Sequence, residues 1–221
     1  MFILYWGGDT IRKSNAKTSL KDIAYKKIKD IIMEGEEEFT SESSLVALLN
    51  MSRTPIRDAL HRLETEGFLK IYSNQGIYFW NPTPIEKNEL FDLRIAIETY
   101  SIRQVPEFTE EHIDYLKKNV ENQHLAIINE DYSFFNELDM DFHQYLLEVN
   151  GNSQFLRNYR NCRERLMTVR TAKHLLKSQI DSIKELIEDH MRIVEALNKD
   201  SQSISAKLLE EHITKGKVPI F

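Results

Sequence analysis

The chain has few of the residues that interrupt helices or cross-link a fold: its 221 residues include five prolines, seven glycines and one cysteine. The single Cys162 excludes an intrachain disulfide framework and is typical of a protein in a reducing cytoplasm. So little proline and glycine favours long helices over irregular stretches. No apolar run reaches the roughly 20 residues that a membrane-spanning helix needs, so we expect no membrane partner.

The net charge of −6 is unevenly distributed along the chain. Residues 1–80 contain equal numbers of basic and acidic side chains, so the whole acidic surplus lies in residues 81–221. A neutral segment can still bind nucleic acid when its basic residues gather on one face. The charge therefore leaves DNA binding open for the first part of the chain.

The first residues form a short apolar run, Met1–Trp6. No basic region precedes the run and no small-residue cleavage site follows it, so a signal peptide is not predicted. We interpret residues 1–16 as a leader outside the folded domains.

Residues 17–80 show the order of elements of a winged helix-turn-helix, in which two helices, a short turn, a third helix and a β-hairpin follow one another. Helical spacing of apolar residues, N-cap residues and strand-like alternation mark the elements. The predicted elements are helices over 17–33, from Thr40 or Ser41, and from an N-cap at Thr54 with Pro55 to Gly67, then strands over 68–72 and 77–80 joined by a turn at 73–76.

After residue 80 the pattern is helical only. Residues 81–84 are interpreted as a linker, because Thr83-Pro84-Ile85-Glu86 is a capping box with proline at the first helical position. The predicted helices of the domain over 85–221 are about 84–104, 109–128, 131–149, 152–176, 178–198 and 201–215. The predicted fold class is mainly α, with a winged helix-turn-helix followed by an all-α antiparallel bundle.

The side chains expected to contact DNA lie at the start of the third helix and at the tip of the wing. The first residues of a recognition helix reach base edges in the major groove, where arginine can donate two hydrogen bonds to guanine. A threonine and the helix N-terminus can bind phosphate. The candidate DNA-binding residues are Ser52, Arg53, Thr54, Arg57, Arg62, Asn74, Gln75 and Gly76.

These segments resemble the GntR family of bacterial regulators. The resemblance runs from Leu45 to Tyr78 and rests on Ser52–Leu60, Arg62–Glu64 and Glu66–Gly67. One position departs from it: the family often has arginine just after the acidic residue that matches Glu42, and this chain has Ser43. The resemblance implies a regulator of transcription that binds double-stranded operator DNA. Because one helix-turn-helix touches too few bases to be selective, we expect a homodimer on paired half-sites.

Four residues of the second domain form a candidate metal site. Asp139 and His143 are four residues apart, so on a helix they share one face and can hold one cation. His190 and His212 fall on two later predicted helices. Three imidazoles and a carboxylate suit Zn²⁺, Ni²⁺ or Mn²⁺, and the residue types do not choose among them. By itself, the Asp139–His143 pair is as consistent with an ordinary polar pair as with a ligand pair.

Residues 84–215 resemble the FCD effector domain of the FadR subfamily of GntR regulators. Six predicted helices fit the shorter, VanR-like variety of this domain better than the seven-helix one. The matching motifs are Leu90–Arg94 with Glu98, Asp139–His143, Asn150–Asn152, His190 and His212.

The FCD resemblance implies one divalent metal ion per chain, held by Asp139, His143, His190 and His212, beside a pocket for a small carboxylic acid effector. Arg94 is expected to meet the carboxylate of that effector. A salt bridge from Arg94 to a carboxylate four residues on is the competing interpretation.

Two further functions stay open. A metal site with an open position can activate water, which would suit a metal-dependent, hydrolase-like enzyme. However, no G-x-S-x-G or H-E-x-x-H motif accompanies the site. Alternatively, the helical domain could only dimerise a DNA-binding protein. We expect a ligand-responsive repressor and no enzyme, because sensing is the simpler use of a metal site beside a DNA-binding domain.

Overall fold

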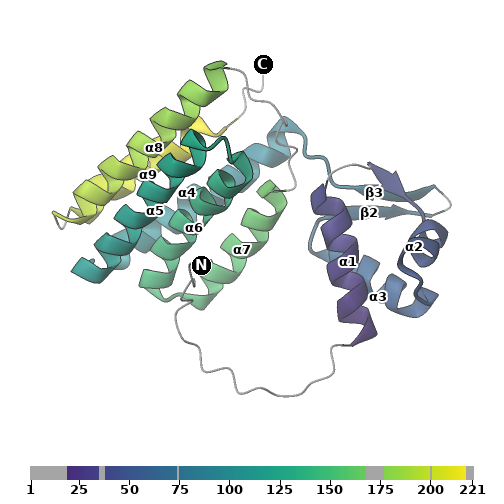
Figure 1. The fold of residues 1–221 in the computed structure, drawn as a ribbon. Coiled ribbons are helices and arrows are strands. Elements are labelled where there is room, and N and C mark those ends of the chain that lie inside the picture. Colours follow the sequence, from purple (N-terminus) through teal and green to yellow (C-terminus); the bar gives the residue numbers. More distant parts are fainter. Residues whose placement is uncertain (1–18, 35–37, 74, 168–176, 200, 218–221) are drawn as a thin grey trace, which may run out of the picture.

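The computed structural model describes residues 19–34, 38–73, 75–167, 177–199 and 201–217. They form a small domain of three helices with a sheet, followed by a bundle of helices (Figure 1). The predicted fold class, a winged helix-turn-helix followed by an all-α bundle, is confirmed. The predicted leader at residues 1–16 and the wing residue Asn74 lie outside the described residues.

The N-terminal domain packs its helices against a three-stranded antiparallel sheet with the strand order β1-β3-β2. The predicted hairpin is present as β2 and β3, with Lys70 opposite Tyr78. The two-residue strand β1 was not predicted, because so short a strand produces no alternation along the sequence. The elements are α1 (Leu20–Glu34), β1 (Phe39–Thr40), α2 (Glu42–Leu49), α3 (Arg53–Thr65), β2 (Leu69–Tyr72) and β3 (Gly76–Phe79).

The start of α3 differs from the prediction. Its N-cap is Ser52, whose extended backbone (φ −68°, ψ 161°) precedes Arg53 as the first helical residue, so the predicted N-cap at Thr54 is wrong. Pro55 is tolerated as the third helical residue, because the first N–H groups of a helix have no partner within it. Consequently Arg53 and Thr54 form the first half-turn of α3. Of the two starts predicted for α2, Thr40 and Ser41, the structure has Ser41 as the N-cap, and Thr40 belongs to β1.

Six helices make up the described part of the bundle. The predicted capping box at Thr83 is present and starts the first of them. The apolar faces meet in one core, which includes Phe142, Leu146 and Leu209, all fully buried. The helices are α4 (Pro84–Gln104), α5 (Glu110–Ile128), α6 (Tyr132–Asn150), α7 (Ser153–Met167), α8 (Lys177–Leu197) and α9 (Gln202–Lys215).

Helix α7 is the part of the bundle that faces the N-terminal domain (Figure 1). Its Glu164 carboxylate lies 2.7 Å from the Lys29 ammonium group on α1. The Asn161 amide donates a hydrogen bond of 3.2 Å to the backbone carbonyl of Glu66. Both of these contacts between the two domains are polar.

The other side of α7 contacts α6. Arg163 Nη1 lies 2.6 Å from Asp141 Oδ1, and the Tyr159 hydroxyl donates a 2.8 Å hydrogen bond to the carbonyl of Met140. One helix thus touches both the N-terminal domain and the middle of α6.

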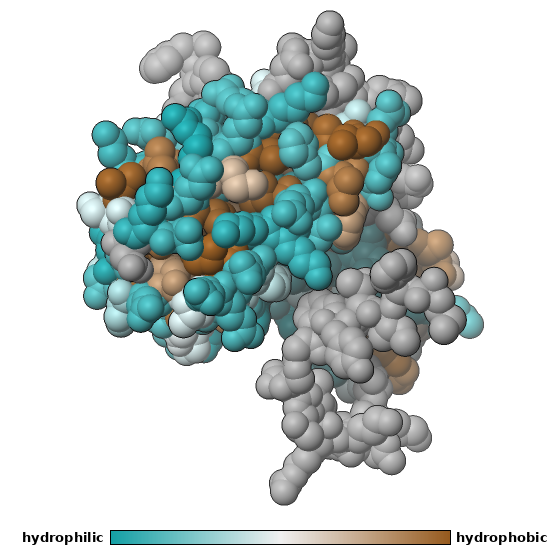
Figure 2. All heavy atoms as spheres, turned by 60° about the vertical axis from the view of Figure 1, so that its left-hand side comes forward, coloured by the Kyte–Doolittle hydropathy of each residue, from teal (hydrophilic) through white to brown (hydrophobic). Residues whose placement is uncertain are grey.

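The surface of the bundle is mainly hydrophilic, with apolar side chains interspersed (Figure 2). Leu125, Ile128 and Ile204 are among the exposed large apolar residues. Among the described helices, none offers a continuous apolar stretch of the length that a bilayer crossing requires.

Gly67 follows the end of α3 and has a left-handed backbone, with φ +83°. A Cβ at this position would lie 3.3 Å from the Arg165 guanidinium group. We expect Gly67→Ala to lose about 1–2 kcal/mol of stability from the left-handed backbone and also to displace Arg165, which lies 4.3 Å from the centre of the Trp80 ring. The measurements are urea unfolding and Trp80 fluorescence in a Trp6→Phe background, which removes the other tryptophan.

The matched control is Gly151→Ala, since Gly151 has φ +76° and an added Cβ would meet nothing within 4 Å. This control should lose similar stability and leave the Trp80 emission unchanged. Equal emission spectra for both variants would contradict the contact between Arg165 and Trp80.

Candidate metal centre and DNA-contact residues

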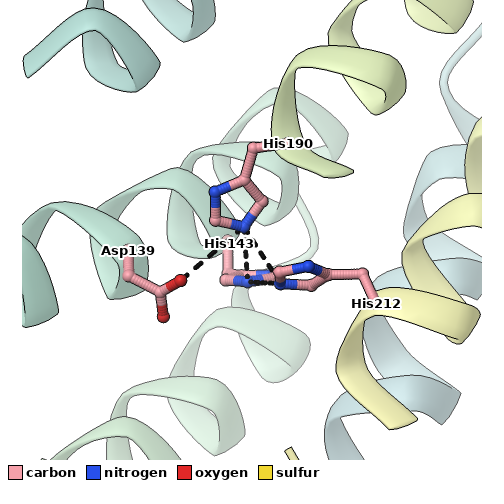
Figure 3. A group of neighbouring side chains, drawn as sticks. All are labelled: Asp139, His143, His190 and His212. Atoms are coloured by element: carbon pink, nitrogen blue, oxygen red, sulfur yellow. Dashed lines mark hydrogen bonds and ion pairs between the residues drawn. The ribbon is translucent and has the colours of Figure 1, made fainter. Parts of the chain in front are cut away.

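Three helices bring the four predicted metal ligands together. Asp139 and His143 project from α6, His190 from α8 and His212 from α9, toward one point between the helices (Figure 3). One ligand atom from each residue lies within 4.8 Å of the others. The sequence-predicted set is therefore assembled in space without a missing member.

The three imidazoles face one another through Nε2. The Nε2 atoms are 3.4 Å apart between His143 and His190, 3.3 Å between His143 and His212, and 3.0 Å between His190 and His212. The rings of His143 and His190 are fully buried. Asp139 is partly exposed, and its Oδ1 lies 3.6 Å from His190 Nε2.

The other ring nitrogen of His190 faces an acceptor whose orientation is fixed by a chain of hydrogen bonds. Asn119 Nδ2 donates to the carbonyl of Leu138 at 3.1 Å, and Gln123 Nε2 donates to Asn119 Oδ1 at 2.7 Å. Gln123 Oε1 is left to accept from His190 Nδ1 at 2.9 Å. Because a backbone carbonyl only accepts, the direction of the chain cannot be reversed.

The same arrangement recurs at His143, where Glu98 Oε2 accepts from Nδ1 at 2.6 Å. With the proton on Nδ1, the Nε2 atoms of His143 and His190 present lone pairs to the centre of the cluster. Imidazole ligands bound at about 2.0–2.1 Å, in octahedral or tetrahedral directions, have nitrogens about 2.8–3.4 Å apart. The observed spacings match that range, so these residues fit a divalent transition ion.

His212 has a weaker partner at its Nδ1. Asp189 Oδ2 lies 3.6 Å away, which is too long for a hydrogen bond but close enough for attraction. Burial would raise the pKa of Asp189, but His212 and the Lys215 ammonium group, 2.6 Å from Oδ2, lower that pKa to about 2. Asp189 therefore keeps a negative charge beside His212.

Burial also favours the neutral form of His143 and His190. It lowers the pKa of His143 despite the opposing attraction of Glu98. It lowers the pKa of His190 well below the ordinary value, and the neighbouring His212 and His143 add to the effect. Neutral imidazole is the form that binds a metal ion.

Arg94 and Glu98 form a buried ion pair beside the cluster. Arg94 Nε lies 2.8 Å from Glu98 Oε1, and the side chains are 3% and 0% exposed. Burial would raise the pKa of Glu98, but Arg94 and His143 outweigh it and lower that pKa to about 2. The salt bridge considered for Arg94 is therefore present. Arg94 Nη2 is nevertheless buried and has no hydrogen-bond partner within the described part of the chain.

The candidate DNA-contact residues at the start of α3 are exposed. The side chains of Arg53 and Arg57 are 68% and 58% exposed, and Ser52 and Thr54 lie beside them at the helix N-terminus. Glu42 of α2 approaches both arginines, at 2.7 Å from Arg57 Nε and 3.9 Å from Arg53 Nε.

The remaining candidates lie apart from this group. Arg62, in the last turn of α3, pairs with Glu66 at 3.0 Å and lies over the ring of Tyr25. Gln75 is exposed in the turn of the hairpin. Gly76 has φ +115°, and a Cβ there would lie 3.1 Å from the carbonyl oxygen of Thr40, so the wing requires glycine at this position.

Comparison with known proteins gives matches over both parts of the chain. Residues 89–215 match the FCD domain, and residues 20–79 match the bacterial regulatory proteins of the gntR family. The chain belongs to the GntR family.

Relatives of this GntR regulator are named as regulators of transcription. It is 30% identical over 186 residues to the Nta operon transcriptional regulator of Aminobacter aminovorans, covering 80% of this chain and 82% of that protein. It is 24% identical to the gluconate operon transcriptional repressor of Bacillus licheniformis, covering 80% and 75% of the two chains. A GntR regulator from Rhodococcus sp. RHA1 aligns with a TM-score of 0.69 at 18% identity, over 89% of this chain and 95% of that one, which shows a shared fold.

The family membership decides between an enzyme and a regulator of transcription. GntR proteins are regulators of transcription, so the enzyme alternative is excluded and the expectation of a regulator is confirmed.

Ser43, which departs from the arginine often found in the family, is followed by Ser44, whose backbone N–H donates to the N-cap Ser41.

Sequence reasoning missed the residues that orient the imidazoles. Asn119, Gln123 and Asp189 were not predicted, and Glu98 was considered only as a partner of Arg94. A signal was present for two of them, because Asn119 and Gln123 share the inward stripe of α5 with Leu116 and Val120. Polar residues on a buried stripe need hydrogen-bond partners.

Two arginine–glutamate pairs of the same spacing allow a stability prediction. Arg94→Met should cost about 3–5 kcal/mol, because it leaves Glu98 as an uncompensated buried carboxylate. The control Arg62→Met breaks the exposed pair with Glu66 and should cost less than about 1 kcal/mol. Urea unfolding at neutral pH measures both losses.

The pH dependence follows from the lowered pKa of Glu98, from 4.5 to about 2. The contribution of the buried pair is complete above pH 4.5 and is lost as the pH falls toward 2. The deficit of Arg94→Met should shrink over the same range. Equal losses at the two sites at neutral pH would contradict the buried pair.

Proposed function

We propose that this GntR regulator is a ligand-responsive repressor that binds operator DNA in the cytoplasm as a homodimer and releases it when a small carboxylic acid binds the bundle. The observation that carries the proposal is the convergence of three buried imidazole Nε2 atoms, 3.0–3.4 Å apart, in a chain whose other domain exposes Arg53 and Arg57 at a helix N-terminus. The first feature suits a bound metal ion, and the second suits recognition of bases in the major groove.

In the bundle, Asp139, His143, His190 and His212 would hold one Zn²⁺, Ni²⁺ or Mn²⁺ ion per chain. A bound ion of this kind supplies a Lewis acid for a carboxylate oxygen. Arg94 is placed to add a charge-assisted hydrogen bond, since its Nη2 is buried and without a partner among the described residues. One relative is named as the repressor of a gluconate operon, and gluconate is the anion of a carboxylic acid. That name agrees with a carboxylic acid as the class of effector.

The response needs a link between the effector site and the DNA-binding domain. A ligand shifts an equilibrium only by its differential affinity for the two states. Helix α7 supports such a link, because Arg163 pairs with Asp141 between two metal ligands of α6, while Glu164 pairs with Lys29 in the other domain. A change in the packing of α6 would therefore alter the position of the DNA-binding domain relative to the bundle.

In the N-terminal domain, Arg53 and Arg57 would enter the major groove, with Thr54 and the helix N-terminus, beside Ser52, on the phosphate backbone. Arg62 and the wing residues Asn74, Gln75 and Gly76 would contact the flanking backbone or minor groove. We expect Arg57→Ala to weaken operator binding by roughly 5- to 150-fold, because a paired guanine contact is worth about 1–3 kcal/mol. Gel-shift titration at fixed salt measures the loss.

Arg160→Ala provides the matched control for that titration, since Arg160 is an exposed arginine of α7 in the bundle, paired with Glu148. Its operator affinity should equal that of the parent. If Arg57→Ala binds as tightly as Arg160→Ala, α3 is not the recognition helix.

The homodimer is tested on the intact protein. Light scattering at micromolar concentration should give twice the chain mass, because two helix-turn-helix domains are needed to read two half-sites. A monomer that still binds its operator selectively would contradict this part of the proposal.

The metal is tested by removing its ligands. His143→Ala and His190→Ala should each abolish binding of the ion, lower the melting temperature of the metal-loaded protein and remove the response to the effector, because an ion bound to the native state stabilises it. The control is His124→Ala, an exposed histidine of α5. Elemental analysis after dialysis against a weak chelator gives the metal content.

The pH dependence of metal binding provides a second measurement. Protons compete for imidazole, but burial lowers the pKa of His143 and His190. Protonation of His143 and His190 should therefore reduce the affinity only below the ordinary histidine range, near pH 6.5. A metal-free parent that still answers to a carboxylic acid would exclude a metal-assisted effector site.

A further inference from the structure

We propose that Glu98 is the positioning residue that joins the two halves of the effector site, setting the tautomer of the metal ligand His143 with one carboxylate oxygen and orienting Arg94 with the other. This inference rests on the proposed function and adds to it a residue that touches neither the ion nor the effector. The two oxygens of one fully buried side chain serve different partners, at 2.6 Å from His143 Nδ1 and 2.8 Å from Arg94 Nε.

Glu98 acts on His143 through the hydrogen bond at Nδ1. An ionised carboxylate only accepts hydrogen bonds, so the proton of His143 must lie on Nδ1, and Nε2 carries the lone pair that a metal ion needs. A carboxylate partner also increases the basicity of the ligating nitrogen. By comparison, His190 has a neutral amide oxygen as its partner, and the carboxylate of Asp189 lies 3.6 Å from His212 Nδ1. Of the three histidines, His143 thus has the shortest contact with an acceptor.

Glu98 also orients Arg94. Glu98 accepts from Nε, on one edge of the guanidinium group, and the buried Nη2 has no hydrogen-bond partner in the described ranges. A buried donor without a partner is costly, and a ligand carboxylate would satisfy it. The salt bridge and the effector contact expected for Arg94 are therefore compatible, because they use different nitrogens of one group.

The replacement Glu98→Gln separates these roles. An amide has one acceptor oxygen and one donor nitrogen, so it cannot accept from both Arg94 Nε and His143 Nδ1. If its oxygen faces Arg94, its nitrogen faces His143 and favours the tautomer with the proton on Nε2, which blocks the metal. If its oxygen faces His143, its nitrogen opposes Arg94 Nε and displaces the guanidinium group.

The experiment titrates the parent, Glu98→Gln and the control Glu148→Gln, an exposed glutamate at the end of α6, with Co²⁺ and then with acetate. Absorption in the visible range reports on the coordination of the cobalt. We expect Glu98→Gln to lose about 10- to 100-fold in affinity for Co²⁺, as is usual for partners of ligating histidines, or a comparable factor for acetate. The control should match the parent in both titrations.

A second measurement needs no variant of Glu98. Imidazole ¹⁵N shifts of the metal-free parent, assigned with His143→Ala, should show His143 protonated at Nδ1. Protonation at Nε2, or a Glu98→Gln variant that binds both Co²⁺ and acetate like the parent, would overturn the role of Glu98 and leave the proposed function standing. A parent that takes up no Co²⁺ would overturn both.

Discussion

Two imidazoles whose Nε2 lone pairs face each other inside the bundle, those of His143 and His190, are the constraint on which the bundle depends. At 3.4 Å, these unshared lone pairs repel each other, and a low dielectric does not screen the repulsion. The protein fixes this arrangement through the acceptors at Nδ1 of His143 and His190. Five helices take part, because Glu98 belongs to α4, Gln123 to α5, His143 to α6, His190 to α8 and His212 to α9. The geometry of the site therefore depends directly on how these five helices pack.

The sequence predicted the elements better than the contacts between them. Local signals such as the capping box at Thr83 mark a helix start without any tertiary information. The error at α3 has a local cause as well, since Ser52 and Thr54 are both good N-cap residues and Pro55 suits either start. The bond between Gln123 and His190 spans 67 residues and depends on how α5 and α8 pack, which no local pattern records. The i, i+4 spacing gave Asp139 with His143, and only the family resemblance joined His190 and His212 to them.

In the N-terminal domain, the ion pair with Glu42 restricts the side chain of Arg57 in the free protein. Ordering an arginine costs conformational entropy, and a contact formed in the free protein removes part of that cost from the binding step. In the proposed complex with DNA, this contact is exchanged for a contact with a base or a phosphate.

Because α7 contacts the N-terminal domain through an ion pair, ionic strength acts on the contact between the domains as well as on DNA binding. Lys29 and Glu164 are 16% and 44% exposed, so dissolved salt screens their attraction. In the proposed complex, salt also screens the attraction between Arg53 or Arg57 and phosphate. Raising the salt concentration would therefore weaken the contact between the DNA-binding domain and the bundle together with the binding of DNA. The salt dependence of operator binding includes the charges of Lys29 and Glu164 only to the extent that their contact differs between the free and the DNA-bound protein.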